Sequence, residues 1–310
     1  MTGRDWWTLA RGVNVVMGVL TVPLGALIVG ALSQDNIAIP LLLHALSVAF
    51  FMAGWNALND LQDINADRIN HPTRPLASGA ISEQAAKKFS WVCFVLSTIM
   101  LGGIIFHTEK TIGHLEWLDS AVIWGIALIL MSAYEFDGIP FNPCLKKTGL
   151  YGNLSVSGLI AVVIVFGAAA VGHGTEILPW SVAICAMMIG TSREIIKDVE
   201  DMDGDSERHT LPMKIGAEKA RMVAWICALL AFISMGMPFA LDLLPLSYII
   251  FLAPALISLT MVKAPIVKGE DTKASKLLKR SLLFGLLGFT VTGLFPILFP
   301  PFLSLLALLS

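Results

Sequence analysis

The stretch Asn59-Asp60-Leu61-Gln62-Asp63-Ile64-Asn65-Ala66-Asp67 marks the point where a hydrophobic segment ends and a polar loop begins. The spacing of its aspartates recurs later in the chain, again at the end of an apolar run. The two sets are Asp60, Asp63, Asp67 and Asp198, Asp201, Asp205. Two acidic clusters with one spacing predict a single site built from two half-sites.

The composition places the chain in a membrane. Of its 310 residues, 56% are hydrophobic and 14% are charged, and the mean hydropathy is +0.76. A soluble chain carries about 25% charged residues, and apolar runs of roughly 18 or more residues indicate membrane spans. The sequence therefore predicts an all-α integral membrane protein and no nucleic-acid partner. The four cysteines are scattered, so we expect neither a disulfide framework nor a zinc site.

The apolar runs predict nine transmembrane helices. They lie near residues 13–32, 39–57, 87–106, 119–135, 152–171, 178–196, 220–240, 245–262 and 281–299. Of the 21 lysines and arginines, all except Lys110 fall in the N-terminal segment or in the loops after spans two, four, six and eight, when residues at the adjoining span ends are counted with the loops. Basic residues mark the cytoplasmic face. We therefore expect a multi-pass protein of the cell membrane whose N-terminus and both acidic clusters are cytoplasmic and whose C-terminus is outside.

The acidic residues are predicted to share helix faces, because residues three and four apart lie on one face of a helix. The two stripes are Asn56, Asp60, Asp63, Asp67 and Glu194, Asp198, Asp201, Asp205. Asn59 and Lys197 each lie four residues before the central aspartate of a stripe. The shared spacing also superposes the second span on the sixth, which predicts an internal repeat of about four helices. The first half then covers about residues 1–135 and the second about 136–310.

Carboxylates that share one helix face repel one another unless a cation lies among them. Magnesium takes oxygen ligands and commonly binds through one or two carboxylates together with substrate phosphates. Basic residues on the same predicted side of the membrane can neutralise such phosphates. The candidates are Arg74, Arg193, Lys197, Lys146 and Lys147. The two clusters therefore fit a diphosphate held by magnesium.

Other interpretations of the acidic residues compete with this one. Acids that are merely solvated at loop ends do not require a repeated spacing. A calcium-binding loop over Asp201, Asp203 and Asp205 needs a glycine and a bidentate glutamate where this chain has Ser206 and Pro212. An ion pathway needs carboxylates deep inside spans, where the chain has very few, although a divalent-cation transporter stays an alternative. A phosphotransferase of the CDP-alcohol type needs an Asp-Gly-x-x-Ala-Arg motif that is absent here.

With these motifs the chain resembles the UbiA superfamily of intramembrane prenyltransferases over nearly its whole length. The first motif is Asn59-Asp60-x-x-Asp63-x-x-x-Asp67 followed by Asn70-x-Pro72-x-Arg74-Pro75-Leu76-x-Ser78-Gly79. The second motif is Lys197-Asp198-x-x-Asp201-x-x-x-Asp205 followed by Thr210-Leu211-Pro212 and Gly216. Either motif alone is a moderate signal, and the two together are a strong one.

Shorter matches support the same resemblance. Arg11-x-x-Asn14 resembles the family's Arg-Pro-x-Asn, with Gly12 in place of proline. Tyr134 and Lys146 resemble the family's tyrosine and lysine after the fourth span, but the separation is longer here, and Lys147 is the alternative. Asn153 resembles a further family position near the site.

The resemblance implies one prenyltransferase domain over residues 1–310, with nine helices around a central cavity that opens to lipid. It also implies magnesium, a polyprenyl diphosphate donor and a lipophilic acceptor. The metal ligands would be Asn59, Asp60, Asp63, Asp67, Asp198, Asp201 and Asp205. The catalytic residues would be Asp63, Asp67, Asp198, Asp201, Lys146 and Arg74. Substrate would be bound by Arg11, Asn14, Asn56, Arg74, Tyr134, Lys146, Asn153 and Lys197.

Within the superfamily, the second motif looks most like the archaeal branch that makes ether lipids. The matching residues are Arg193-Glu194-Ile195-Ile196-Lys197-Asp198 with Glu200-Asp201-x-x-Gly204-Asp205, and Asn14-Val15-Val16-Met17-Gly18 of the first span. That branch implies geranylgeranyl diphosphate as donor and geranylgeranylglyceryl phosphate as acceptor. An aromatic acceptor of the hydroxybenzoate or naphthoate type is the alternative. Arg11 does not decide between them, because either acceptor carries an acidic group that needs a cation.

Overall fold

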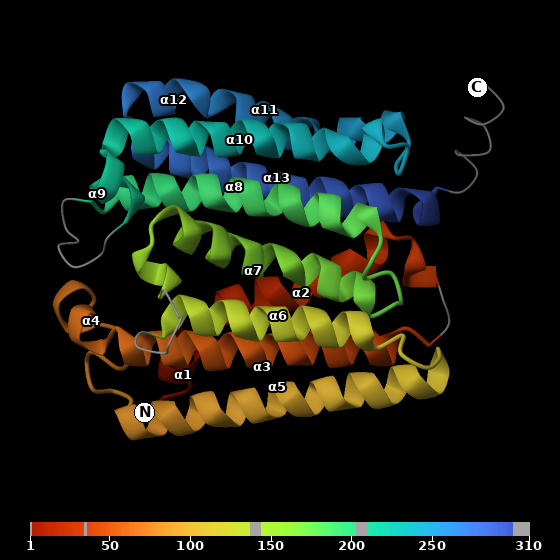
Figure 1. The fold of residues 1–310 in the computed structure, drawn as a ribbon, viewed down its shortest axis with the longest axis horizontal. Helices are drawn as coiled ribbons and strands as arrows, with labels where there is room; N and C mark the ends of the chain where they lie inside the picture. The colour runs from red at the N-terminus through yellow and green to blue at the C-terminus, as the bar shows by residue number, and fades with distance from the viewer. Residues whose placement is uncertain (1, 34–35, 137–143, 203–209, 300–310) are drawn as a thin grey trace. The chain divides into compact units, whose positions relative to one another are not determined.

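The computed structural model describes residues 2–33, 36–136, 144–202 and 210–299, and within these ranges it contains helices and no strand. The α-helices (Figure 1) are α1 Gly3–Leu9, α2 Gly12–Ile28, α3 Ala38–Gln62, α4 Ile64–Asn70, α5 Glu83–Thr111, α6 Leu118–Glu135, α7 Leu150–Ala169, α8 Ile177–Glu200, α9 Leu211–Ile215, α10 Ala217–Ala240, α11 Ala253–Met261, α12 Lys263–Lys268 and α13 Asp271–Leu298. Three short 3-10 helices, η1 Ala31–Ser33, η2 Leu145–Lys147 and η3 Leu246–Leu252, complete the description.

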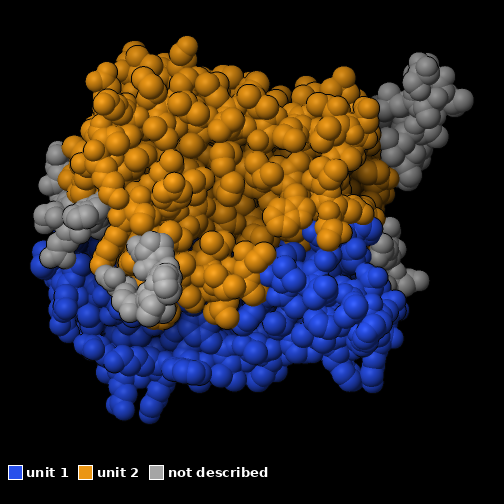
Figure 2. All heavy atoms as spheres, in the orientation of Figure 1, with its two compact units in different colours: residues 1–26, 34–124, 166–174 blue, residues 27–33, 125–165, 175–310 orange. Residues whose placement is uncertain are grey.

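The chain divides into two compact units, shown in blue and orange in Figure 2. Unit 1 comprises residues 1–26, 34–124 and 166–174, and unit 2 comprises residues 27–33, 125–165 and 175–310. The first acidic motif belongs to unit 1 and the second to unit 2. Each unit is therefore described by itself.

Within the described ranges, each of the nine predicted spans overlaps a helix or a broken run of helices. Seven of these are long and apolar enough to cross a membrane, and the pair α1 and α2, bent by 62° relative to each other, makes an eighth if it counts as one span. Helix α8 has 24 residues but carries a charged end with Arg193, Lys197 and Asp198. The chain is a multi-span helical membrane protein.

Unit 1 is built on α3 and α5, which pack along each other (Figure 1). Their contact is close at Gly54, because a side chain there would meet the Cβ of Cys93 at 2.9 Å and the Ser90 carbonyl at 3.2 Å. At one end of this pair lies a hydrophobic cluster. Its buried members are Leu9, Ala57, Ile64, Leu76, Ile81 and Ala86. The cluster packs α1, α3, α4, the segment 71–82 and α5 together, and so surrounds the first acidic motif with apolar side chains.

Unit 2 is built on α8, which packs against α10 and α13, while α13 also packs against α11 (Figure 1). Small residues allow close approach here. A Cβ on Gly288 of α13 would meet the Phe251 carbonyl at 2.6 Å, and one on Gly293 would meet the Leu27 carbonyl at 2.9 Å. The run 245–262, expected as one helix, is instead η3 followed by α11, and α12 comes directly after it. Pro254 at the start of α11 and Pro265 inside α12 lack the N–H that a continuous helix needs.

Candidate active site

The first acidic motif covers the end of α3 and the whole of α4. Helix α3 ends at Gln62, and Asp63 is the junction residue, with φ −91° and ψ 6°. The backbone ladder nevertheless continues, because Asp63 N–H donates to the Asn59 carbonyl at 3.0 Å and Asp67 N–H donates to the Asp63 carbonyl at 2.8 Å. Asp60 and Asp67 are buried, and Asp63 is half-buried. The predicted row of acidic residues is thus kept, although the helix is interrupted at Asp63.

Two arginines bind the buried acids of this motif. Arg74 Nη1 donates to both oxygens of Asp67, at 2.8 and 2.7 Å, and lies 3.7 Å from Asp60 Oδ1. Arg11 Nη2 donates to Asp60 Oδ1 at 2.8 Å and to Asn59 Oδ1 at 2.9 Å. The side chains of Asp60 and Asp67 are only 4% and 8% exposed. Because a buried charge is costly unless it is paired, these contacts compensate both carboxylates.

Arg74 is positioned by the compact turns between α4 and α5. Its N–H donates to the His71 carbonyl at 3.0 Å, its carbonyl accepts from Ser78 N–H at 2.9 Å, and Ile81 N–H closes the segment on the Pro75 carbonyl at 3.0 Å. Gly79 permits the chain reversal with φ +75°. The turns formed by the Asn-x-Pro-x-Arg-Pro run therefore fix the backbone that carries the Arg74 guanidinium group.

Arg11 is positioned by the bend between α1 and α2. Its own backbone is left-handed, with φ 51°, a conformation that is strained for a residue with a side chain. Gly12 lies directly beneath the indole of Trp7, so that a Cβ at this position would overlap the ring. Asn56 on α3 donates to the Ala10 carbonyl at 2.9 Å and ties the bend to the first motif. Glycine at position 12, where the family has proline, is therefore explained by Trp7.

The second acidic motif lies at the end of α8 in unit 2. Asp198 Oδ2 accepts a hydrogen bond from Asn153 Nδ2 at 2.9 Å, which joins α8 to the start of α7. Asp201 is the exposed C-cap of α8. Lys197 Nζ donates to Glu194 Oε2 at 3.1 Å, and the other oxygen of Glu194 accepts from Arg193 at 2.9 Å. Asp205 lies outside the described residues.

The family-like lysine is also placed in unit 2. Lys146 lies in η2, and its Nζ is 3.1 Å from Oε1 of Glu135, the last residue of α6. Lys147 is exposed, and its carbonyl accepts from Lys214 Nζ at 3.2 Å. Tyr134 is half-buried beside Glu135. The acid at position 135 was missed by the sequence analysis, where only its place at the last residue of an apolar span could have indicated a buried partner.

The structure brings some of the predicted site residues into contact and leaves others apart. In unit 1 it brings five of them together, namely Arg11, Asn59, Asp60, Asp67 and Arg74. Asn14 lies exposed on α2. Arg11, a predicted substrate-binding residue, contacts Asp60 of the first motif.

The side-chain oxygens of these two motifs are of the kind that binds magnesium. They are carboxylate and amide oxygens, the ligands that magnesium prefers. Within the described residues, no group of three or more His, Cys, Asp or Glu side chains is arranged to hold a metal ion. Magnesium does not require such a cage, because it keeps waters and binds through few carboxylates together with substrate phosphates. The residues therefore fit a metal that binds together with a phosphorylated substrate.

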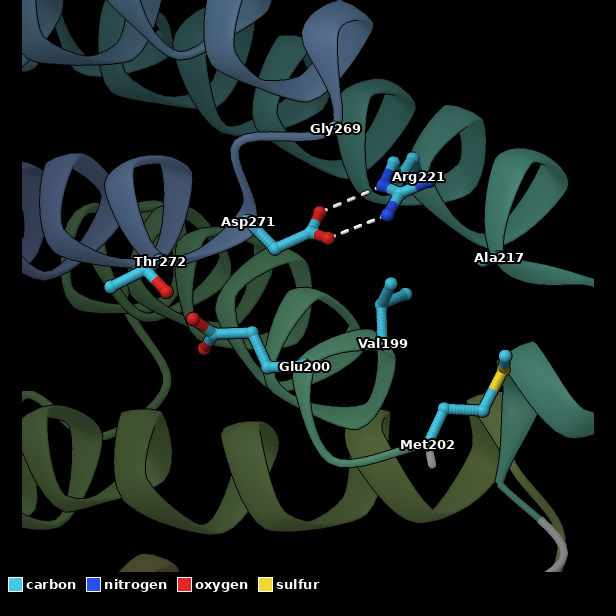
Figure 3. Close-up of a pocket in the computed structure, with 8 residues that line it drawn as sticks. All are labelled: Val199, Glu200, Met202, Ala217, Arg221, Gly269, Asp271 and Thr272. Atoms are coloured by element: carbon cyan, nitrogen blue, oxygen red, sulfur yellow. Dashed lines mark hydrogen bonds and ion pairs between the residues drawn. The ribbon is translucent and has the colours of Figure 1, made fainter. Parts of the chain in front are cut away.

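A pocket of about 380 Å³ lies beside the second motif within unit 2 (Figure 3). It is lined by Val199, Glu200, Met202, Ala217, Arg221, Gly269, Asp271 and Thr272. Arg221 and Asp271 face each other across it and form two hydrogen bonds of 2.7 and 2.6 Å. This pair joins the start of α10 to the start of α13. Arg221 and Asp271 compensate each other, so Glu200 is the remaining charged side chain of the lining.

Comparison with known proteins gives consistent matches over most of the chain. The model of the UbiA prenyltransferase family matches residues 18–287. The digeranylgeranylglyceryl phosphate synthase of Methanosarcina mazei is 33% identical over 299 residues, which cover 92% of this chain and 97% of the relative. The synthase of the same name from Methanopyrus kandleri is 31% identical over 290 residues, with coverages of 92% and 98%.

Solved structures share the fold. One, described as giving structural and mechanistic insights into digeranylgeranylglyceryl phosphate synthase in membranes, aligns with a TM-score of 0.74 and 28% identity, and covers 94% of this chain and 98% of its own. A UbiA homologue from Archaeoglobus fulgidus bound to GPP and Mg²⁺ aligns with a TM-score of 0.64 and 21% identity, with coverages of 93% and 99%. The second likeness concerns the fold alone.

Proposed function

Because the chain belongs to the UbiA prenyltransferase family, we propose that it transfers a geranylgeranyl group from geranylgeranyl diphosphate to geranylgeranylglyceryl phosphate in ether-lipid synthesis. The observation that carries this proposal is the similarity to archaeal digeranylgeranylglyceryl phosphate synthases over nearly the full length of both chains. The reaction breaks the bond between the allylic carbon and the diphosphate oxygen. It forms an ether bond to the glycerol hydroxyl and releases diphosphate and one proton.

Both acidic motifs are proposed to bind the diphosphate through magnesium. The ligands drawn from the family motif are Asn59, Asp60, Asp63, Asp67, Asp198, Asp201 and Asp205. The metal, when bound, supplies positive charge to the oxygens of the leaving diphosphate. Support comes from the burial of Asp60 and Asp67, because two desolvated carboxylates interact strongly with any cation that replaces their arginines.

The chain's own cations are proposed to complete the diphosphate site. Arg74, Lys146 and Lys197 neutralise the charge that develops on the leaving oxygens. Lys146 is preferred over Lys147, because its side chain is 13% exposed and is held by Glu135, whereas Lys147 is exposed. The remaining substrate contacts are assigned to Arg11, Asn14, Asn56, Tyr134 and Asn153. Arg11 acts at the first motif in this scheme, because that is where its guanidinium group lies.

The acceptor and the membrane set the remaining chemistry. An alkyl hydroxyl is a weak nucleophile and must lose its proton as the allylic cation forms. A carboxylate of the motifs or the departing diphosphate takes that proton. An apolar, lipid-embedded environment protects the cation from water.

The finer architecture is proposed from the sequence. It consists of one domain with nine spans around a central cavity, an internal repeat of about four helices, cytoplasmic acidic motifs and an external C-terminus. Counting α8 and the bent pair α1 and α2 together with the seven apolar spans gives this number. The distribution of basic residues, with Lys110 alone on one side, supports the orientation.

The test is incubation of the purified protein with magnesium, labelled geranylgeranyl diphosphate and a panel of acceptors, with the products identified by mass. We expect digeranylgeranylglyceryl phosphate and released diphosphate. If the protein prenylates hydroxybenzoate or a naphthoate and leaves geranylgeranylglyceryl phosphate untouched, the ether-lipid assignment is wrong while the family assignment stands. Flux of divalent cations into liposomes without consumption of diphosphate would instead favour a transporter.

A further inference from the structure

Glu135 and Lys146 form a buried ion pair in unit 2. Glu135 is the last residue of α6, and its side chain is 1% exposed. Its Oε1 lies 3.1 Å from Lys146 Nζ, and the lysine side chain is 13% exposed. A carboxylate this deeply buried is costly unless it is paired and hydrogen-bonded. The pair is therefore an arrangement that the local fold maintains and not a chance surface contact.

The backbone that carries Lys146 is fixed from two sides. Cys144 Sγ approaches the Tyr134 carbonyl at 3.7 Å and the Glu135 carbonyl at 4.0 Å, within the range of thiol hydrogen bonds. On the other side, a Cβ on Gly152 of α7 would meet the Leu145 carbonyl at 2.6 Å, so α7 packs directly on η2. The end of α6 thus holds η2 through its main chain and holds the lysine through its side chain.

The same helix that supports η2 also contacts the second acidic motif. Asn153 follows Gly152 on α7 and donates to Asp198 Oδ2 at 2.9 Å. Lys146 and Asp198 therefore share one rigid support within unit 2. A shift of η2 against α7 would change the position of the ammonium group relative to this aspartate.

We propose that Glu135 is a positioning residue that orients the Lys146 ammonium group toward the diphosphate of the donor. This inference rests on the proposed function, in which Lys146 binds that diphosphate. Lysine is a point charge on a long flexible stem and has three N–H donors. Glu135 takes one of these donors at 3.1 Å and so fixes the stem of the side chain. Glu135 acts through Lys146 and does not itself touch substrate.

Two effects of the Glu135 charge oppose each other. Its negative charge weakens the local attraction for a diphosphate, whereas its hydrogen bond reduces the freedom of Lys146. A lysine oriented in advance loses less entropy when it binds. The structure favours orientation, because the fixed backbone of η2 leaves the side chain as the main source of freedom. Loss of the carboxylate should therefore weaken diphosphate binding rather than strengthen it.

The experiment compares wild type, Glu135→Gln, Lys146→Gln and the double variant Glu135→Gln/Lys146→Gln. Each protein is assayed for the Michaelis constant of geranylgeranyl diphosphate and for the affinity of inorganic diphosphate with magnesium by titration calorimetry. We expect Glu135→Gln to raise the Michaelis constant and to weaken diphosphate binding about tenfold, the size of one hydrogen bond to a charged group. The turnover number should change less.

The double variant separates positioning from general damage. If Glu135 acts through Lys146, adding Glu135→Gln to the Lys146→Gln protein should have no further effect on diphosphate affinity. Removing both charges avoids leaving one member of this pair buried without the other, so the double variant also controls for instability of a single variant. Glu135→Asp, which keeps the charge on a shorter side chain, should lie between wild type and Glu135→Gln. Glu270→Gln is the matched control, because Glu270 forms an exposed lysine pair at 3.2 Å.

The outcomes distinguish this inference from the proposed function. Unchanged or tighter diphosphate binding by folded Glu135→Gln overturns the inference, and so does a full additional loss in the double variant. If wild type binds magnesium diphosphate but makes no ether product, the proposed function fails and the binding comparison still decides the role of Glu135. If wild type does not bind diphosphate, the inference fails together with the site.

Discussion

Arg74 binds Asp67 through a single nitrogen, since Nη1 donates to both carboxylate oxygens at 2.8 and 2.7 Å and lies 3.7 Å from Asp60. One arginine thus compensates two buried acids of the first motif. A second, Arg11, shares Asp60 with it. The two buried acids of the predicted metal site, Asp60 and Asp67, are therefore compensated by the chain's own cations in this structure.

Replacing Arg74 by glutamine should destabilise the protein in the absence of divalent metal. The expected loss is about 1–3 kcal/mol, because charge-assisted hydrogen bonds to buried carboxylates are removed. Added magnesium should recover part of this loss and should stabilise the variant more than wild type. Thermal unfolding in detergent, with chelator and then with magnesium, measures both effects.

Arg68→Gln is the matched control for that variant. Arg68 lies one residue after Asp67 in the chain, but its pair with Glu83 is 3.6 Å long and about half exposed on both sides. Such surface pairs contribute about 0–1 kcal/mol. An equal loss in the two variants would contradict the assignment of Arg74 to the buried acids.

Removing one aspartate from either motif should abolish most prenyl transfer. Asp63→Ala and Asp201→Ala should each lower kcat/KM by about 100-fold or more, the effect of deleting one group that stabilises transition-state charge. Their melting temperatures should change little, because Asp201 is exposed and the cap contact of Asp63 is made by its backbone N–H, which alanine keeps. Product formation at saturating magnesium measures the loss.

The exposed Glu218 on α10 provides the comparison for the aspartate variants. Glu218→Gln should retain activity, since it removes a carboxylate of the same unit outside the motif. Near-normal turnover by Asp63→Ala or by Asp201→Ala would contradict the proposal that both motifs take part in the reaction.

Gly12→Ala should disturb the bend that places Arg11. A methyl group there overlaps the Trp7 ring, so the ring or the backbone must move, at about 1–3 kcal/mol for overpacking. Gly3→Ala, four residues before Trp7 in α1, meets nothing within 4 Å and should be neutral. Thermal unfolding and tryptophan fluorescence compare the two variants. If Gly12→Ala and Gly3→Ala have the same melting temperature and the same fluorescence, the Trp7 ring is not the reason for glycine at position 12.

The orientation in the membrane is testable with two single cysteines. The native cysteines at 93, 144, 185 and 227 are all buried, so their background reactivity should be low. In sealed vesicles we expect Lys110→Cys and Lys273→Cys, both at exposed positions, to react from opposite sides with an impermeant maleimide. If both cysteines react from the same side of the vesicles, the proposed nine-span topology is wrong.

Much of the fold was predictable because hydropathy and helix length report directly on membrane spans. The ends of α6 and α7 lie within two residues of the expected ones. Breaks were less visible, since the junction at Asp63 has no proline or glycine to mark it. In the site, spacing predicted that Asp60 and Asp67 share a face, and both do contact Arg74. The pair Arg11–Asp60 joins residues 49 positions apart, and Glu135–Lys146 joins the end of α6 to η2 across 11 positions. Both depend on how helices pack, which no local pattern contains.

The pairing of Asp60 with Arg11 also bears on how the protein is made. Arg11 precedes Asp60 by 49 residues and Arg74 follows Asp67 by seven, so one counter-ion is synthesised before the acids and the other directly after them. An unpaired carboxylate would be expensive to leave at the edge of a bilayer. The nascent chain therefore carries the arginines that compensate these aspartates, and it can insert into the membrane before magnesium binds. Membrane integration does not have to wait for cofactor supply, and magnesium limitation should reduce catalysis without reducing the amount of protein in the membrane.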